Sequence, residues 1–184
     1  AQGVRQRKLR RHPDAVSKGT ILLVEDDPNS VYFFQYALGK LRIENPLQVA
    51  KHGLEAIEYL EGVGEFANRE KFPIPKLVLL DLRMPYATGF EVLEKIRSCL
   101  GKGKVVVVVF TSSSSDSDIS QAYRLGANGY IVKPSQLGEL LKIVQSIRDF
   151  WMTLNETLSG SLSWRNETPL ETGSSQAQAR GRPA

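Results

Sequence analysis

The sequence has little cysteine and no long apolar segment, and these absences exclude several classes of protein. Its 184 residues include one cysteine, Cys99, so an internal disulfide and a cysteine-based metal cluster are excluded. The longest apolar run, residues 105–110, is far shorter than the ~20 residues that cross a bilayer. The basic N-terminal stretch has no apolar segment behind it, so no secretory signal is predicted. We therefore expect a cytoplasmic protein without a membrane partner.

The net charge of +4 comes from the ends of the chain. Residues 1–18 carry six basic side chains and one acidic one, whereas residues 19–158 carry 15 basic and 17 acidic ones. A mildly acidic central region does not offer the basic surface that binds a phosphate backbone, so we expect no specific nucleic-acid binding. Residues 1–18 and 159–184 lack apolar periodicity and are predicted to be disordered arms. They flank a single domain at residues 19–158.

Within the central region, short apolar runs alternate five times with helical patterns. The runs lie at residues 20–24, 47–49, 77–80, 105–110 and 130–132. Apolar residues at helical spacing follow them at 31–41, 54–63, 90–100, 119–125 and 135–157. This order predicts an α/β fold, doubly wound, with a five-stranded parallel sheet covered by helices on both faces.

Charged and hydroxyl side chains follow four of the predicted strands. Glu25, Asp26 and Asp27 follow the first, Asp81 the third, Thr111 ends the fourth and Lys133 follows the fifth. Functional groups collect at the carboxyl ends of parallel strands. Clustered carboxylates repel one another, and Mg²⁺ is a hard cation that takes oxygen ligands.

Each of these residues also has an ordinary structural explanation. Asp27 before Pro28 has the features of a helix N-cap, and a lone threonine or lysine after a strand is most often a turn or surface residue. Their coincidence at one sheet edge favours a functional site that binds a divalent cation.

Four motifs carry a resemblance to a known family. The segments ILLVEDDP, LVLLDLRMPYATGFEVL, VVVFTSS and GANGYIVKP resemble the receiver domain of two-component response regulators over residues 19–155. The resemblance implies the (βα)5 flavodoxin-like receiver fold. The insertion GVGEFANREKFPIPK and the ending SIRDFW are similar to the small cyanobacterial response regulators that pair with phytochromes.

The resemblance implies a role for each residue at the strand ends. Asp81 would accept a phosphoryl group from a histidine kinase, here of the phytochrome type. Asp26, Asp81 and the backbone carbonyl of Arg83 would bind Mg²⁺ directly, and Glu25 would act through a bound water. Such a domain is a signalling module rather than an enzyme, with only Mg²⁺-dependent self-phosphorylation and slow dephosphorylation.

The resemblance also implies a conformational switch. Lys133 and Thr111 would contact the phosphoryl oxygens, and Tyr130 would turn inward into the space that Thr111 leaves. A cis peptide bond at Lys133–Pro134 is a further expectation from the family. Gly89 is expected to serve a turn or close packing at the start of the third helix.

The last helical pattern is apolar over a wide arc and runs past the end of the sheet. Phe150, Trp151 and Leu154 lie near its end, and such a surplus of apolar surface is typical of a partner contact. We therefore predict a homodimer in which these residues contact a second copy. The alternative is that the aromatic residues fold back on their own domain.

Two enzyme classes fit the sequence less well than this interpretation. A phosphatase with an aspartyl nucleophile needs Asp-x-Asp after the first strand, but Glu25 occupies the first of those places. A P-loop nucleotidase needs GxxxxGK[ST], which the sequence lacks.

Overall fold

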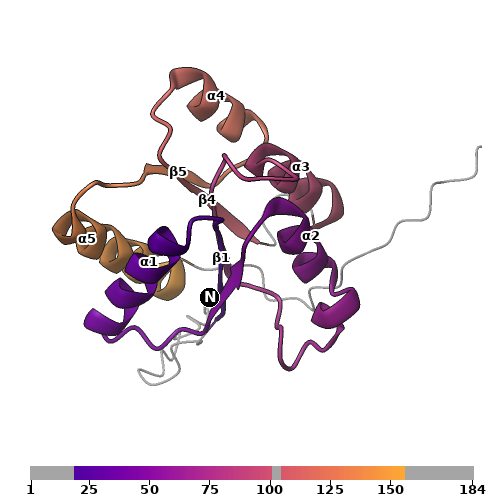
Figure 1. Ribbon diagram of the computed structural model, residues 1–184, viewed down its shortest axis with the longest axis horizontal. Coiled ribbons are helices and arrows are strands. Elements are labelled where there is room, and N and C mark those ends of the chain that lie inside the picture. The colour runs from indigo at the N-terminus through magenta and orange to yellow at the C-terminus, as the bar shows by residue number, and fades with distance from the viewer. Residues whose placement is uncertain (1–18, 101–104, 156–184) are drawn as a thin grey trace, which may run out of the picture.

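The computed structural model describes residues 19–100 and 105–155, and in them five parallel strands form one sheet. The strands are β1 (Ile21–Val24), β2 (Leu47–Ala50), β3 (Leu77–Leu80), β4 (Val106–Thr111) and β5 (Gly129–Val132). Their order across the sheet is β2-β1-β3-β4-β5, and β1, β4 and β5 are labelled in Figure 1. The predicted fold class is confirmed. The two arms predicted at residues 1–18 and 159–184 lie outside the described residues.

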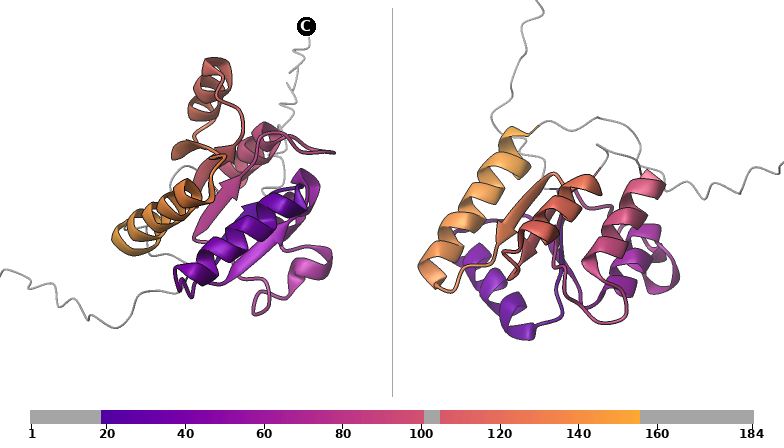
Figure 2. Two further views of the ribbon diagram at one scale, coloured as in Figure 1. Left: turned by 60° about the vertical axis from the view of Figure 1, so that its left-hand side comes forward. Right: turned by 90° about the horizontal axis from the view of Figure 1, so that it is seen from above.

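Helices cover both faces of this sheet (Figure 2). They are α1 (Pro28–Lys40), α2 (Gly53–Glu61), α3 (Gly89–Leu100), α4 (Asp116–Arg124) and α5 (Leu137–Ile147). Alternate residues of each strand point to opposite faces. Ile21 and Leu23 pack with α1 and α5, whereas Leu22 and Val24 pack with α2 and α3. None of these helices is long and apolar enough to span a bilayer.

The insertion before β3, residues 62–76, packs against α2. Phe66 of the short helix η1 (Gly64–Ala67) and Phe72 form ring contacts with Tyr59 of α2. Arg69 donates to the carbonyls of Tyr59 and Leu60, both at 2.7 Å. Carbonyl groups in the last turn of a helix have no donor within the helix, and Arg69 supplies one here. The insertion therefore closes the C-terminal end of α2.

The last helix departs from the predicted continuous α-helix at residues 135–157. α5 ends at Ile147, and a π-helical segment, η2 (Arg148–Leu154), follows it. A π-turn holds one residue more than an α-turn, so the position that faces the core after Ile147 is Met152, five residues on. Met152 is buried, whereas Leu154 is 67% exposed.

Candidate functional site

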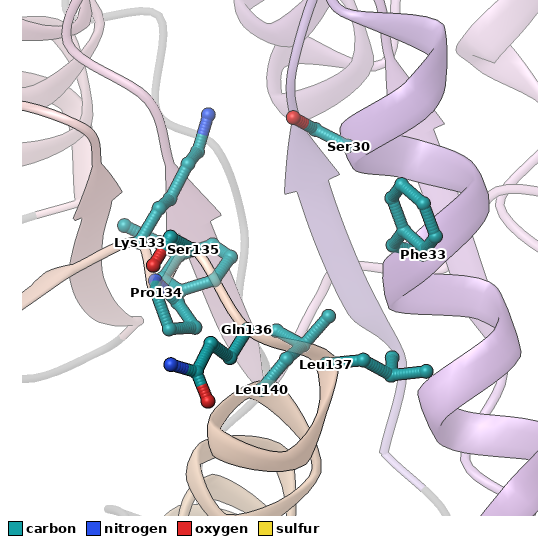
Figure 3. A pocket seen from close by; sticks show the side chains of 9 residues that line it. Ser30, Phe33, Lys133, Pro134, Ser135, Gln136, Leu137 and Leu140 are labelled. Atoms are coloured by element: carbon teal, nitrogen blue, oxygen red, sulfur yellow. The ribbon is translucent and has the colours of Figure 1, made fainter.

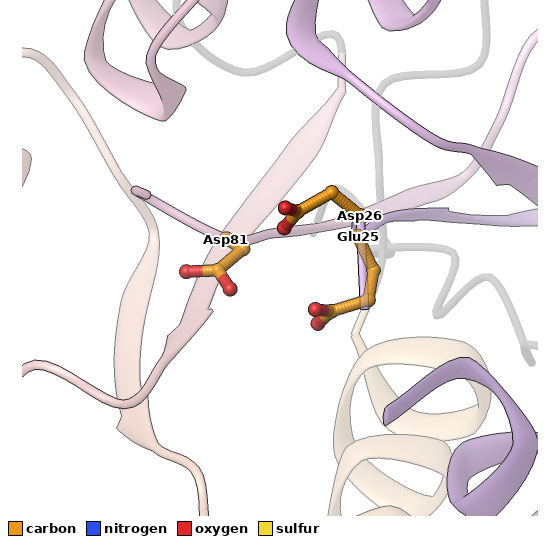
Figure 4. Close-up of side chains that lie close together, drawn as sticks. All are labelled: Glu25, Asp26 and Asp81. Atoms are coloured by element: carbon orange, nitrogen blue, oxygen red, sulfur yellow. The ribbon is translucent and has the colours of Figure 1, made fainter. Parts of the chain in front are cut away.

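The first part of the site is built by the pairing of β1 with β3. Val24 and Leu80 are partners in register, and the Asp81 amide donates to the Val24 carbonyl at 3.0 Å. The residues that follow these strands are therefore neighbours. Carboxylate oxygens of Glu25, Asp26 and Asp81 all lie within 4.8 Å of one another (Figure 4).

Burial differs among the three carboxylates. Glu25 and Asp81 are buried, and Asp26 is exposed. An exposed carboxylate beside two buried ones leaves the cluster open to solvent on one side. The set of oxygen donors suits a hard divalent cation that keeps some of its water ligands.

Lys133 completes the site from the next strands of the sheet. Its amide donates to the Thr111 carbonyl at 2.7 Å, which fixes the chain where β5 ends. Its Nζ atom lies 2.5 Å from Oδ2 of Asp81 and 2.5 Å from Oε2 of Glu25. The lysine thus bridges two buried carboxylates of the cluster.

Burial and ion pairing oppose each other in this group of charges. Burial lowers the pKa of Lys133, but its hydrogen bonds and attraction to Asp81 and Glu25 outweigh burial, and the net pKa is raised. Burial raises the pKa of Glu25, and the contacts with Lys133 offset only part of that effect. The ammonium form of Lys133 is therefore the stable one in the site.

Asp27 does not join the carboxylate cluster. Its side chain is the N-cap of α1 and accepts hydrogen bonds from the amides of Asn29 at 3.0 Å and Ser30 at 3.2 Å. These contacts, the Asn29 amide first, lower the pKa of Asp27. The N-cap explanation given by the sequence is confirmed.

The segment between β3 and α3 is held close to Asp81. The Arg83 amide donates to Oδ1 of Asp81 at 3.3 Å, and the Gly89 amide donates to the Leu82 carbonyl at 3.1 Å. A Cβ atom on Gly89 would lie 2.1 Å from the Asp81 carbonyl oxygen. Gly89 therefore serves close packing against the backbone of Asp81, as predicted.

Thr111 is the last residue of β4, and Tyr130 lies on the neighbouring strand β5. The Thr111 side chain is buried, and its Oγ1 accepts a long hydrogen bond, 3.5 Å, from the Ser113 amide. The Tyr130 hydroxyl donates to the Ser113 carbonyl at 3.0 Å. Burial raises the pKa of Tyr130, and the hydrogen bond to Ser113 opposes that shift.

The expectation of a cis peptide bond at Lys133–Pro134 is wrong. The bond between Lys133 and Pro134 is trans, like every other peptide bond in the part of the chain that the structure describes. Trans is the preferred form of an X–Pro bond by about 0.5–1 kcal/mol. The trans chain still brings Lys133 to Asp81 and Glu25.

A pocket beside Lys133 was not foreseen from the sequence. It has a volume of about 280 Å³ and lies between α1 and the start of α5 (Figure 3). Its lining is mostly apolar and consists of Ser30, Phe33, Phe110, Lys133, Pro134, Ser135, Gln136, Leu137 and Leu140. The sequence signals for it, an aromatic residue on the outer face of α1 and apolar residues at the start of α5, are too common to be read as a pocket.

A second unforeseen feature is the contact between His52 and Tyr86. His52 caps α2 by accepting from the Glu55 amide at 3.1 Å, and its ring centroid lies 5.1 Å from that of Tyr86. Tyr86 has a φ of 68°, a conformation that non-glycine residues rarely adopt. A tyrosine at this place gives no sequence signal of a left-handed turn.

Comparison with known proteins decides the family. Residues 21–145 match the response regulator receiver domain. The chain belongs to the response regulator receiver family. Response regulator Rcp1 of Synechocystis is 37% identical to it over 132 residues, which cover 72% of this chain and 88% of Rcp1.

Solved receiver structures support the same assignment. The phosphorylated cyanobacterial phytochrome response regulator RcpA has a TM-score of 0.70 at 35% identity, covering 77% of this chain and 99% of RcpA. The Mn²⁺-bound form of Rcp1 has a TM-score of 0.68, also at 35% identity and with the same coverage of both chains. The predicted similarity to cyanobacterial phytochrome response regulators is confirmed.

The end of the receiver domain exposes only part of the predicted dimer surface. Phe150 and Leu154 are 52% and 67% exposed. Trp151 is half-buried, packs against the core between the sheet and α1 and α5, and forms a ring contact with Phe150 at 4.7 Å. The alternative that an aromatic residue folds back on its own domain therefore applies to Trp151.

Proposed function

We propose that this chain is a response regulator that accepts a phosphoryl group on Asp81 from a histidine kinase and changes conformation in response. The observation that carries the proposal is the contact of the buried Asp81 carboxylate with Lys133, beside Glu25 and Asp26. Receiver family membership supports it.

The chemistry of transfer follows from the charges in the site. A carboxylate oxygen of Asp81 forms a bond to phosphorus while the P–N bond of the phosphohistidine breaks, and the electron pair of that bond returns to the imidazole. Such a reaction depends mainly on positioning and on stabilising charge at the phosphoryl oxygens. The ammonium of Lys133 can follow a phosphoryl oxygen because it is a mobile point charge.

Mg²⁺ is the cation that we propose for the carboxylate cluster. Asp26, Asp81 and the backbone carbonyl of Arg83 would hold it directly, and Glu25 would act through a water molecule. The cation supplies positive charge that offsets the negative charge of the carboxylates and of the incoming phosphoryl group. The oxygen donors and their spacing support this proposal, as does the Mn²⁺-bound form of Rcp1.

Thr111 and Tyr130 are proposed as the switch residues. Thr111 ends β4 beside the site and can donate its hydroxyl to a phosphoryl oxygen. If Thr111 moved, the segment after β4 would move with it, and the Tyr130 hydroxyl contacts this segment at the Ser113 carbonyl. A two-state surface biased by a new charge is a common form of signalling switch.

The partners are proposed from the relatives. Similarity to RcpA and Rcp1 supports a phytochrome-type kinase as the phosphoryl donor. A cytoplasmic setting is proposed from membership of the receiver family. The exposed side chains of Phe150 and Leu154 support a homodimer, because large apolar groups at a helix end are stabilised by contact with a second copy.

Phosphorylation by a small-molecule donor tests the function. Incubation of the full chain with acetyl phosphate and Mg²⁺ should add one phosphoryl mass, seen by intact-protein mass spectrometry. Asp81→Asn should abolish the addition, and Asp116→Asn, which changes an exposed carboxylate on α4, should not. Equal labelling of the Asp81 variant would overturn the proposal.

A further inference from the structure

The carboxylate of Asp118 is not used in the way that its sequence context predicts. Ser115 is the N-cap of α4, and Asp118 lies three residues later. This spacing is that of a capping box, in which the acidic side chain accepts from the amide of the N-cap residue. In the structure, the Ser115 amide donates to the Ser113 hydroxyl at 3.4 Å instead. Asp118 is therefore available for other partners.

Those partners come from two segments beside Asp81. The Ser113 hydroxyl donates to Oδ2 of Asp118 at 2.6 Å. The Arg83 guanidinium lies 3.5 Å from the same oxygen. One carboxylate oxygen thus ties the segment after β3 and the segment after β4 to the first turn of α4.

This tie connects the proposed phosphoacceptor with the proposed switch tyrosine. At one end, the Arg83 amide donates to Oδ1 of Asp81. At the other end, the Ser113 carbonyl accepts from the Tyr130 hydroxyl. The connection runs from Asp81 through Arg83, Asp118 and Ser113 to Tyr130.

We propose that Asp118 is a positioning residue that couples the charge state of Asp81 to the segment between β4 and α4 and to Tyr130. The inference rests on the proposed function of Asp81. It adds a contact on α4 to the residues named for that function.

The Arg83–Asp118 pair is suited to exchange. The Arg83 side chain is 72% exposed and that of Asp118 19%, and exposed ion pairs are weak. A phosphoryl group on Asp81 brings about 1.5–2 negative charges close to Arg83. The guanidinium then leaves Asp118 for the phosphoryl group, and the start of α4 loses one of its ties.

Hydrogen–deuterium exchange of the full chain tests this coupling. The measured segment is residues 112–122, without donor and with acetyl phosphate and Mg²⁺. Asp118→Asn removes the charge that holds Arg83 but keeps an oxygen that can accept from the Ser113 hydroxyl. Asp116→Asn is the matched control, since it changes an exposed carboxylate in the same helical turn.

The inference predicts a distinct pattern. Phosphorylation should accelerate exchange in this segment several-fold in the wild type and in Asp116→Asn. Asp118→Asn should exchange several-fold faster before phosphorylation and change little afterwards. Arg83→Gln should behave in the same way, and the double variant should add nothing, which separates coupling from a general loss of stability.

Two results would overturn the inference. One is equal exchange in Asp118→Asn and Asp116→Asn before phosphorylation, and the other is additive effects in the double variant. If Asp118→Asn does not fold, the comparison of Arg83→Gln with the wild type decides. A wild-type chain that gains no phosphoryl mass would contradict the proposed function alone. The contact of Asp118 with Arg83 is still tested in that case, because Asp118→Asn and Asp116→Asn are also compared without a phosphoryl donor.

Discussion

The Nζ atom of Lys133 and the Oδ2 atom of Asp81 lie 2.5 Å apart, although 52 positions separate them in the sequence. β3 and β4 are neighbours, and β4 pairs with β5, so the ends of these strands bring the two residues together. The same lysine contacts Glu25. Its positive charge therefore stabilises two buried carboxylates.

Replacement of Lys133 by methionine should destabilise the metal-free protein. The change leaves Glu25 and Asp81 without their cation, and removal of one partner from a buried ion pair typically costs about 3–5 kcal/mol. Because Mg²⁺ supplies positive charge at the same carboxylates, its addition should restore part of the loss. Urea unfolding with and without Mg²⁺ measures both effects.

The matched control for this variant is Lys95→Met. Lys95 pairs with Glu61 at 2.9 Å on the surface, and surface pairs contribute about 0–1 kcal/mol. Equal losses of stability in the two variants would show that Lys133 is not an essential counter-ion.

Asp26→Ala should weaken Mg²⁺ binding strongly. The change removes the exposed carboxylate of the cluster, and Mg²⁺ makes only a few protein contacts. Asp27→Asn should change the affinity much less, since Asp27 caps α1 and asparagine is also a good N-cap. Isothermal titration calorimetry compares the two. An unchanged dissociation constant in Asp26→Ala would locate the metal site elsewhere.

Tyr59 should make the stability depend on alkaline pH. Burial raises the pKa of Tyr59 from 10.0 to about 12, so the folded state disfavours the tyrosinate. The contribution is fully present below the unfolded pKa near 10 and is lost as the pH rises towards 12.

Tyr59→Phe isolates this pH effect. It should cost about 1 kcal/mol at neutral pH, because the hydroxyl donates to the Pro73 carbonyl at 2.7 Å. The difference in unfolding free energy from the wild type should then shrink between pH 10 and 12. A constant difference over that range would mean that the hydroxyl ionises equally in both states.

A double variant, Phe150→Ser with Leu154→Ser, should give monomers that remain folded. Both side chains are exposed, so their loss removes apolar contact surface without opening the core. Leu54→Ser is the control, because Leu54 is an exposed apolar residue on α2. Light scattering at tens of micromolar measures the mass. A monomeric wild type would contradict the homodimer.

The architecture of the site was predictable because it follows from strand ends. A short apolar run that stops at Asp81 marks where a buried strand ends, and parallel strands bring such ends to one edge. The places of Glu25, Asp26, Thr111 and Lys133 follow by the same argument.

Other features depend on details that periodicity does not carry. The change from α5 to η2 inserts one residue into a turn, which makes Met152 the buried residue of this segment. The position of Asp118 in the sequence fits a capping box, but its carboxylate accepts a hydrogen bond from the Ser113 hydroxyl instead. Such choices between two nearby partners depend on tertiary packing, so the sequence around Asp118 does not reveal them.

Chemical mapping of the phosphorylated residue tests the central claim most directly. After treatment with acetyl phosphate and Mg²⁺, borohydride reduces the acyl phosphate to an alcohol, and peptide mass spectrometry locates the reduced side chain. We expect conversion of Asp81 to homoserine, with Glu25 and Asp26 unchanged. Conversion at Glu25 or Asp26, or no conversion at Asp81 in a labelled protein, would contradict it.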